Sequence, residues 1–307
     1  MMQFHALSTS THDRLVAAGL DPIAVADLVR GTVLEDLDGG IDVTSTATVP
    51  ADQRSIATFG ARAEGRLAGI VVAAAVVDTV CGPAASTFQI MVSDGDAVAP
   101  GDVLAQVEAP TRLMLTAERT ALNLLCHLSG VATATSKWVD AIAGTGAVVR
   151  DTHKTTPGLR ALEKFAVRCG GGQNHRMSLS DAALVKDNHI VAAGGVVAAF
   201  DKVRSFAPGI PIEIEVDTLD QLRVAIAAGA ELVLLDNMDD RTMRAAVGIV
   251  AEHKATTGRE VLLEASGGLS LERARSVAET GVHFISVGSI THSVSVLDIG
   301  LDLHTVI

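Results

Sequence analysis

Polar and charged residues follow each of six short apolar segments in the second half of the chain. In chain order they are Asp151–Lys154, Lys186–His189, Glu213 with Glu215, Asp236 with Asn237, Glu264–Gly268, and Gly288 with Ser289. An unpaired buried charge is costly, so charges of both signs at equivalent positions indicate a polar cavity that binds a substrate. The alternative is that these charges form internal ion pairs.

The apolar segments and the helical segments between them determine where those residues lie. The apolar segments span residues 147–150, 183–186, 212–216, 231–235, 261–265 and 283–287. Alternation of strands with helices predicts a parallel sheet with right-handed crossovers, that is, a (β/α) barrel whose loops converge over one mouth. Six strands are fewer than the usual eight, so either the barrel is incomplete or further strands lie near residues 160–180.

Two loops of small residues follow the last two predicted strands. Ser266-Gly267-Gly268 precedes a helical run from Ser270 to Glu279, and Val287-Gly288-Ser289 has the same layout one unit later. Backbone N–H groups at such positions can hold a phosphate, which in barrels commonly binds after the last strands. A glycine after a strand can also mark only a tight turn, but the two adjacent loops together favour phosphate binding.

Basic side chains are concentrated in residues 150–188 of a chain that carries a formal net charge of −12. His175 and Arg176 follow a run of three glycines, residues 170–172, where a loop can approach a ligand closely. Arginine suits a bidentate grip on carboxylate or phosphate, and lysine supplies a point charge. This stretch is therefore the candidate source of ligands for an anionic substrate.

A helix is predicted over residues 157–168, within the same basic stretch. Arg160, Lys164 and Arg168 recur there at spacings of four residues, so they fall on one helix face. We expect that face to be exposed to solvent and to take no part in the cavity.

The first half of the chain is predicted to form a smaller α+β domain. Helices are predicted over residues 21–37 and 73–80, strands over 55–62, 67–72, 87–92 and 103–108, and a hairpin loop over 94–102. A long helical stretch from Thr111 pauses at Ser129-Gly130, resumes to Ile142 and bridges the two domains. We therefore predict domains over residues 1–128 and 129–292, with a C-terminal tail, residues 293–307, that packs back on the first domain.

Composition excludes several classes of protein. Hydrophobic residues make up 48% of the 307 residues, which is sufficient for a sizeable core. The negative net charge argues against nucleic acid or an anionic membrane as partner, and the apolar run over residues 67–77 is too short to span a bilayer. The three cysteines form no CxxC pair, and the N-terminus lacks a signal-peptide layout, so we expect a reducing, cytoplasmic location.

Ordered motifs along the chain resemble those of the quinolinate phosphoribosyltransferase family, also called carboxylating nicotinate-nucleotide pyrophosphorylases. The segments that carry the resemblance are Asp151–Arg160, Gly170–Arg176, Val185–His189, Glu213–Val216, Leu235–Met238 and Glu264–Gly268, with Asp42–Thr44 and Glu118–Asn123 in the first half. The resemblance covers nearly the whole chain. It implies an N-terminal open sandwich domain, an incomplete (β/α) barrel and dependence on Mg²⁺. It also implies a homodimer with active sites between subunits, and assembly of such dimers into a trimer of dimers.

The resemblance also implies a reaction. Phosphoribosyl diphosphate and quinolinate give nicotinate mononucleotide, diphosphate and CO2, a step of NAD biosynthesis. Arg119 from the partner subunit, His175, Arg176 and Lys186 would hold the pyridine dicarboxylate, and Thr152, His153 and Lys154 would contact substrate anions. Glu215 and Asp236 would bind ribose hydroxyls or Mg²⁺, the two small-residue loops would take the 5′-phosphate, and Lys154, Glu215 and Asp236 would be catalytic.

One position departs from the family pattern, because His153 stands where the family usually has an arginine that contacts substrate. An imidazole with a pKa near ~6.5 is only partly charged at neutral pH, so substrate affinity is the property that this change affects. Two alternatives stay open at this point. A lysine at a strand end, here Lys186, also occurs in Schiff-base aldolases, and the histidine is compatible with a non-catalytic anion-binding relative.

Overall fold

The computed structural model describes residues 2–306, so Met1 and Ile307, at the ends of the predicted domains, lie outside the described residues. The chain forms two compact units. The first comprises Met1–Ala134, Gly158–Gly170 and Ser293–Ile307, and the second comprises Thr135–Pro157 and Gly171–His292. Residues 158–170 thus group with the first unit, although they fall within the range expected for the barrel domain. The boundaries after residues 128 and 292 stay a prediction.

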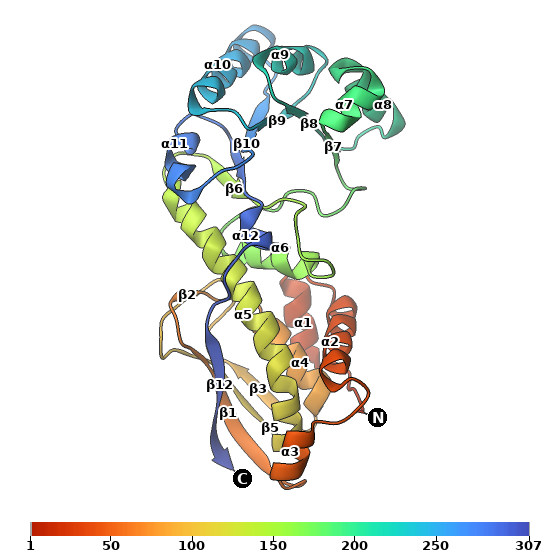
Figure 1. Cartoon of the computed structure of the whole chain (residues 1–307), viewed down its shortest axis with the longest axis vertical. Coiled ribbons are helices and arrows are strands. Elements are labelled where there is room, and N and C mark those ends of the chain that lie inside the picture. The colour runs from red at the N-terminus through yellow and green to blue at the C-terminus, as the bar shows by residue number, and fades with distance from the viewer. Residues whose placement is uncertain (1, 307) are drawn as a thin grey trace. The chain divides into compact units, whose positions relative to one another are not determined.

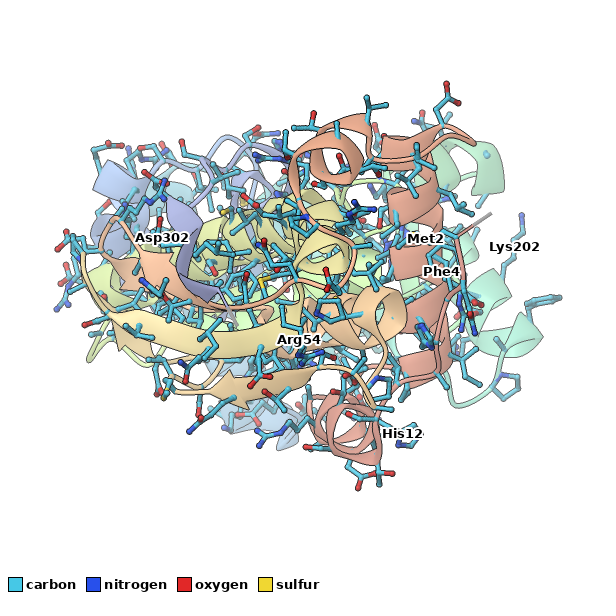
Figure 2. All side chains as sticks on the ribbon, turned by 90° about the horizontal axis from the view of Figure 1, so that it is seen from below. Met2, Phe4, His12, Arg54, Lys202 and Asp302 are labelled. Atoms are coloured by element: carbon cyan, nitrogen blue, oxygen red, sulfur yellow. The ribbon has the colours of Figure 1, made fainter. Side chains whose placement is uncertain are left out.

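An antiparallel sheet forms the centre of the first unit (Figure 1). Its strand order is β12-β1-β5-β3, with β1 at Arg54–Ala61, β3 at Thr87–Ile90, β5 at Val103–Pro110 and β12 at Ile299–Val306. Side chains along β1 alternate between buried and half-buried, as expected for a sheet with one covered face. Figure 2 marks Arg54 at the start of β1 and Asp302 on β12, the strand that pairs with β1.

Helices cover this sheet. They are α1 (Thr9–Ala17), α2 (Pro22–Leu37), α3 (Val43–Thr48) and α4 (Ile70–Cys81). A separate two-stranded sheet pairs β2 (Gly65–Arg66) with β4 (Ala97–Val98). Helix α4 packs on β3 and β5, and α1 and α2 pack on α4. Helix α2 follows its N-cap, Asp21, whose side chain accepts a hydrogen bond from the Ile23 backbone N–H, so the helix predicted over residues 21–37 is confirmed.

The strand predicted over residues 67–72 is wrong, because α4 begins at Ile70. Asp94 fixes that start: its Oδ1 accepts hydrogen bonds from the backbone N–H groups of Gly69 at 2.6 Å and Ile70 at 2.9 Å. Every residue of α4 is buried. A helix that is apolar on all sides has no 3.6-residue hydrophobic period, so its sequence resembled that of a buried strand.

Helix α5 (Thr111–Ala141) continues through Ser129-Gly130 without the pause that the sequence suggested. A Cβ atom at Gly130 would collide with the backbone carbonyl of Ser295. The glycine therefore allows close approach of the C-terminal segment to the helix, instead of ending the helix.

Helix α6 (Arg160–Cys169) confirms the helix predicted within the basic stretch but corrects its orientation. Lys164 is fully buried, so the predicted exposed stripe is wrong at that residue. Glu163 is also fully buried, and its carboxylate pairs with His127 Nε2 at 2.8 Å. Arg168 is exposed and Arg160 half-buried, so the spacing of four residues was misleading at Lys164 alone.

The second unit is built on a parallel sheet of six strands (Figure 1). Its order is β6-β11-β10-β9-β8-β7, with β6 at Val148–Arg150, β7 at Ala183–Val185, β8 at Ile212–Val216, β9 at Leu232–Asp236, β10 at Leu262–Ser266 and β11 at Phe284–Ser286. The intervening helices are α7 (Asp187–Ala193), α8 (Val196–Phe206), α9 (Leu219–Ala227), α10 (Asp240–Thr257), a 3-10 turn η1 (Leu271–Arg273), α11 (Ala274–Ala278) and α12 (Ser289–His292). The predicted α/β class, an incomplete (β/α) barrel with an N-terminal α+β domain, is confirmed.

A short extended segment lies beside β6. Gln173 forms a single parallel bridge with Arg150, in which the Gln173 N–H donates to the Val149 carbonyl at 2.8 Å. Within residues 160–180 of the described chain, α6 and this bridge take the place of further regular strands. The bridge places the residues that follow, including His175 and Arg176, at the edge of the sheet where the strands have their C-terminal ends.

Apolar side chains on the strands of the second unit are buried. Val149, Ile214, Val233, Leu235 and Leu263 are each exposed by 1% or less.

Within the described residues, no helix combines the length and apolar character needed to cross a bilayer.

Candidate active site

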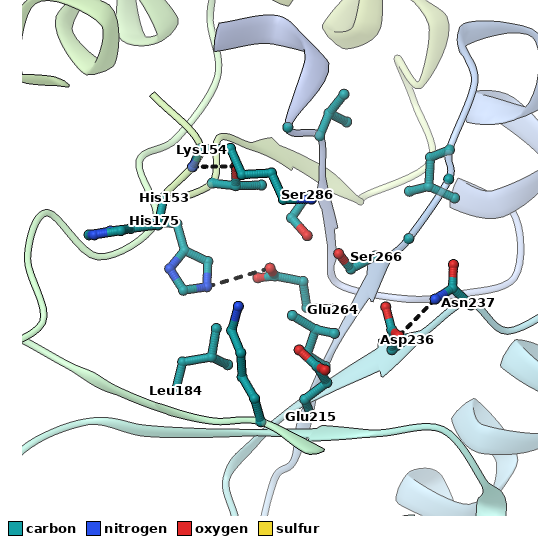
Figure 3. A pocket seen from close by; sticks show the side chains of 18 of the residues that line it. His153, Lys154, His175, Leu184, Glu215, Asp236, Asn237, Glu264, Ser266 and Ser286 are labelled. Carbon is teal, nitrogen blue, oxygen red and sulfur yellow. Dashed lines mark hydrogen bonds and ion pairs between the residues drawn. The ribbon is translucent and has the colours of Figure 1, made fainter. Parts of the chain in front are cut away.

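A cavity of about 510 Å³ lies at the C-terminal ends of the six parallel strands (Figure 3). Most of the predicted site residues line it: Thr152, His153, Lys154, His175, Arg176, Lys186, Glu215, Asp236, Ser266, Gly267, Gly268, Val287, Gly288 and Ser289. Arg119 lies on α5 in the first unit and is not among the lining residues. The pattern of polar residues after strands therefore located one cavity.

The loop after β6 and the Gln173 segment are joined by a buried carboxylate. Asp151 is fully buried, and its Oδ1 accepts the backbone N–H of His175 at 2.8 Å. Its Oδ2 accepts a hydrogen bond from Asn174 Nδ2 at 2.6 Å. A carboxylate that bonds both groups fixes the backbone from which the side chains of His175 and Arg176 extend.

The imidazole of His175 is held at both nitrogens. Nδ1 accepts the backbone N–H of Arg176 at 2.8 Å, and Nε2 lies 2.6 Å from Glu213 Oε2. Because a backbone N–H can only donate, Nδ1 acts as the acceptor in this contact, and Nε2 is the ring nitrogen that faces Glu213.

Glu264 lies below this ring at the closed end of the cavity. It is fully buried, accepts a hydrogen bond from Arg150 Nη1 at 2.7 Å, and its Oε1 lies 3.6 Å from His175 Nε2 (Figure 3). Burial raises the pKa of Glu264, and the nearby charge of Glu213 raises it further. The alternative of internal ion pairs is therefore correct for this buried layer.

The exposed charges of the cavity differ from that layer. Among the described residues, Lys154, Lys186, Glu215 and Asp236 form no ion pair with one another or with other side chains within 4.0 Å. Burial raises the pKa of Glu215, the charge of Asp236 raises it too, and Lys186 opposes the shift. These charges are available to a ligand.

Two groups of side chains could hold a metal ion. His175, Glu213 and Glu264 carry ligand atoms within 4.8 Å of one another. Glu213 Oε2 pairs with His175 and Glu264 Oε2 with Arg150, whereas Oε1 of each carboxylate is buried without a hydrogen-bond partner. Glu215 and Asp236, at the ends of β8 and β9, offer carboxylate oxygens in the cavity itself. The second group suits a hard divalent cation such as Mg²⁺.

Backbone forms the opposite wall. Gly267 and Gly268 have φ angles of 94° and 57°, which L side chains rarely adopt, and both lie in the loop after β10. At Gly288 a Cβ atom would lie only 3.2 Å from Lys154 Cδ and 3.2 Å from His292 Nε2. Both loops therefore expose main chain to the cavity, as a site for a phosphate requires.

Sequence reasoning missed some of the lining residues. These are Leu184, Leu234, Leu269, Ser286 and His292. His292 closes the short helix α12 one turn after Gly288, so helical spacing from the glycine loop was the signal that could have found it. The leucines gave no signal, because an apolar residue on a barrel strand is the ordinary case.

Comparisons with known proteins agree with this geometry. Residues 42–129 match the model of the quinolinate phosphoribosyl transferase N-terminal domain, and residues 131–302 match that of the C-terminal domain. A carboxylating nicotinate-nucleotide pyrophosphorylase of Mycobacterium leprae is 50% identical over 280 residues, covering 91% of this chain and 97% of that protein. A probable carboxylating nicotinate-nucleotide pyrophosphorylase of Bacillus subtilis is 39% identical over 287 residues, with coverage of 92% and 95%.

Solved structures have the same fold. The nicotinate-nucleotide pyrophosphorylase of Francisella tularensis superposes with a TM-score of 0.85 at 37% identity, covering 92% of this chain and 96% of that chain. Human nicotinic acid phosphoribosyltransferase, at 16% identity and a TM-score of 0.58, shares the fold alone. With both domain models matched in order and relatives aligned over most of their length, the chain belongs to the quinolinate phosphoribosyltransferase family.

Proposed function

We propose that this chain transfers the phosphoribosyl group of phosphoribosyl diphosphate to the nitrogen of quinolinate and releases diphosphate, CO2 and nicotinate mononucleotide. The observation that carries the proposal is the cavity itself. Cationic side chains line one wall and glycine loops line the other, in a chain that is 50% identical to a carboxylating nicotinate-nucleotide pyrophosphorylase. Both substrates are anions, and each wall suits a different anion.

The cationic wall is proposed to bind quinolinate. Arg176 and Lys186 would neutralise the two carboxylates of the pyridine ring, one by a bidentate contact and one as a point charge. His175 lies on the same wall and fixes the backbone of Arg176. Thr152 and His153 complete this side.

The glycine wall is proposed to bind the 5′-phosphate of the second substrate. Backbone N–H groups of Ser266–Gly268 and of Val287–Ser289 would donate to the phosphate oxygens. Lys154 borders both walls, because its Cδ lies next to Gly288 and its carbonyl accepts a hydrogen bond from Thr291 Oγ1 at 2.7 Å. Its ammonium group would meet negative charge that develops on the departing diphosphate.

Glu215 and Asp236 would bind the ribose hydroxyls and a Mg²⁺ ion carried by the diphosphate. Burial raises the pKa of Glu215 and the charge of Asp236 raises it further, and two such neighbouring carboxylates fit a divalent cation. Such an ion would polarise the diphosphate as a leaving group. The same carboxylates would stabilise positive charge at C1 of the ribose.

In the proposed reaction the quinolinate nitrogen forms a bond to C1 while the bond from C1 to the diphosphate oxygen breaks, and the electron pair leaves with diphosphate. The bond between C2 and its carboxylate then breaks. The electron pair stays at C2, which takes a proton from solvent, and CO2 departs. Holding the quaternised ring in a site that excludes water favours this loss, because the positive nitrogen stabilises the pair left at C2.

Assembly and location are proposed on the same basis. We expect a homodimer, arranged further as a trimer of dimers, in which Arg119 completes the quinolinate site of the partner subunit. Light scattering of the protein tests the oligomeric state. Mixing Arg119→Ala with another inactive site variant tests whether the site is shared, because activity would return only if it is. Three free cysteines fit a reducing compartment, which we expect to be the cytoplasm.

Product formation tests the reaction directly. Phosphoribosyl diphosphate and Mg²⁺ are mixed with quinolinate or with nicotinate, and nicotinate mononucleotide and diphosphate are measured. The proposal predicts both products with quinolinate and none with nicotinate. Turnover of nicotinate, or the absence of turnover with quinolinate, would contradict it.

A further inference from the structure

Asn237 has an unusual backbone conformation beside the proposed carboxylate site. Its φ angle is 54°, and Asp38 is the other non-glycine residue with positive φ in the described chain. Asparagine, aspartate and glycine tolerate this left-handed region better than other residues do. The side chain of Asn237 is exposed, so burial does not explain the conformation.

The conformation ties the ends of two neighbouring strands together. Asn237 follows Asp236, the last residue of β9, and its backbone N–H donates to the carbonyl of Ser266 at 3.0 Å, the last residue of β10. Its side-chain Nδ2 donates to Asp236 Oδ2 at 2.7 Å (Figure 3). One residue thus contacts both a carboxylate of the cavity and the start of a glycine loop.

Gly267 shows how closely the two parts fit. A Cβ atom at that position would collide with Oδ1, Cγ and the backbone nitrogen of Asn237. The amide group of Asn237 therefore packs against the main chain of the loop. Any movement of Asn237 would therefore displace both the Asp236 carboxylate and the loop.

We propose that Asn237 is a positioning residue, which orients the Asp236 carboxylate and the Ser266–Gly268 loop as one unit toward phosphoribosyl diphosphate. The inference rests on the proposed function. The hydrogen bond from Nδ2 occupies Oδ2 of Asp236 and leaves Oδ1 for a ribose hydroxyl or a cation. The bond to Ser266 sets the distance between that carboxylate and the phosphate-binding main chain.

Substitutions separate the side chain from the backbone. Asn237→Gly keeps the tolerance for positive φ and removes the amide, whereas Asn237→Asp keeps the shape and replaces the donor by an oxygen that repels Asp236. Asp38→Gly, at the other positive-φ residue, is the control for a change of backbone freedom alone. Affinity for phosphoribosyl diphosphate with Mg²⁺ is measured by calorimetry, beside thermal unfolding.

We expect Asn237→Gly to weaken the Kd by about tenfold and Asn237→Asp by at least as much, since partners that orient a ligating carboxylate typically matter to that extent. Unfolding temperatures should stay close to that of the parent protein for Asn237→Gly and Asp38→Gly. An unchanged Kd for Asn237→Gly would overturn the proposal, as would a loss of affinity that simply follows a lowered unfolding temperature.

A double-mutant cycle with Asp236→Asn tests whether Asn237 acts through Asp236. If it does, the double variant Asp236→Asn with Asn237→Gly binds about as weakly as Asp236→Asn alone. Multiplied losses would mean that Asn237 contacts the ligand independently and would overturn the proposal. Turnover of the parent protein with quinolinate is measured first, because its absence would refute the proposed function, whereas normal turnover with unaffected variants would refute only the role of Asn237.

Discussion

The two walls of the cavity achieve anion binding in different ways. On the cationic wall, Arg176 and Lys186 present side chains, and a buried layer of Asp151, Glu213 and Glu264 contacts the backbone and the imidazole of His175. On the glycine wall the main chain itself faces the cavity, and the absence of Cβ atoms creates the room. The first wall therefore depends on charge and on its supporting layer, and the second depends on conformation.

That difference suits the two proposed substrates. A flat dicarboxylate is held by charges placed around its plane, and a phosphate is held by N–H groups that converge on its oxygens. Changes on the cationic wall should therefore act through charge, whereas changes on the glycine wall should act through sterics and backbone strain. Substitutions on the two walls separate an effect of charge from an effect of sterics.

Loss of a charge from the cationic wall should have the largest effect. Lys186→Met should lower kcat/KM for quinolinate by about a hundredfold, because it removes a cation aimed at an anionic substrate in a partly desolvated site. Lys202→Met is the matched control, since Lys202 lies on α8 with its side chain extending into solvent (Figure 2). Equal losses in the two variants would show that overall charge, not the wall, matters.

A methyl group on the glycine wall should have the next largest effect. Gly267→Ala should raise the KM for phosphoribosyl diphosphate by about tenfold, since the new Cβ collides with Asn237 and the φ angle is strained. At Gly268 the nearest atom to such a Cβ is 3.9 Å away, so Gly268→Ala should raise the same KM less. Initial-rate kinetics of both variants decide this, and a larger effect at Gly268 would contradict the steric argument.

Titration of Glu264 in the buried layer should make the stability of the protein depend on pH. Burial raises the pKa of Glu264 and the charge of Glu213 raises it further, so between the unfolded-state and folded-state pKa values the folded protein binds more protons than the unfolded chain does. Stability from this group is therefore greatest at low pH and falls as pH rises through the folded-state pKa. Glu264→Gln removes that titration while keeping an acceptor for Arg150.

The unfolding temperature of the parent protein should consequently fall more steeply, as pH rises above the ordinary pKa of a glutamate, than that of Glu264→Gln. Thermal unfolding of both proteins as pH is raised from that value provides the measurement. Parallel curves would mean that Glu264 is ionised throughout and that its burial has no cost in this layer.

The smallest effect is expected at His153. If its imidazole is protonated when quinolinate binds, the KM for quinolinate should rise by a few-fold between about pH 6 and about pH 8. His153→Arg, whose charge does not titrate there, should flatten that profile. A rise that persists in the variant would assign the titration to another group.

Sequence patterns predicted the parallel sheet and most of the cavity lining because strand ends in a barrel converge whatever the loops between them do. They failed where burial hides periodicity, as in α4, and where a charge is buried, as at Lys164. They placed Asn237 at a strand end but gave no sign of its contact with Ser266, since that contact joins the ends of two different strands. The orientation of the His175 ring likewise needed the distance from its Nδ1 to the next backbone N–H.

Initial rates with both substrates varied, for Arg176→Met and Gly267→Ala, test the two-wall account most directly. The account predicts that Arg176→Met raises mainly the KM for quinolinate and that Gly267→Ala raises mainly the KM for phosphoribosyl diphosphate. If both variants raised the KM of the same substrate, the assignment of one wall to each substrate would be wrong.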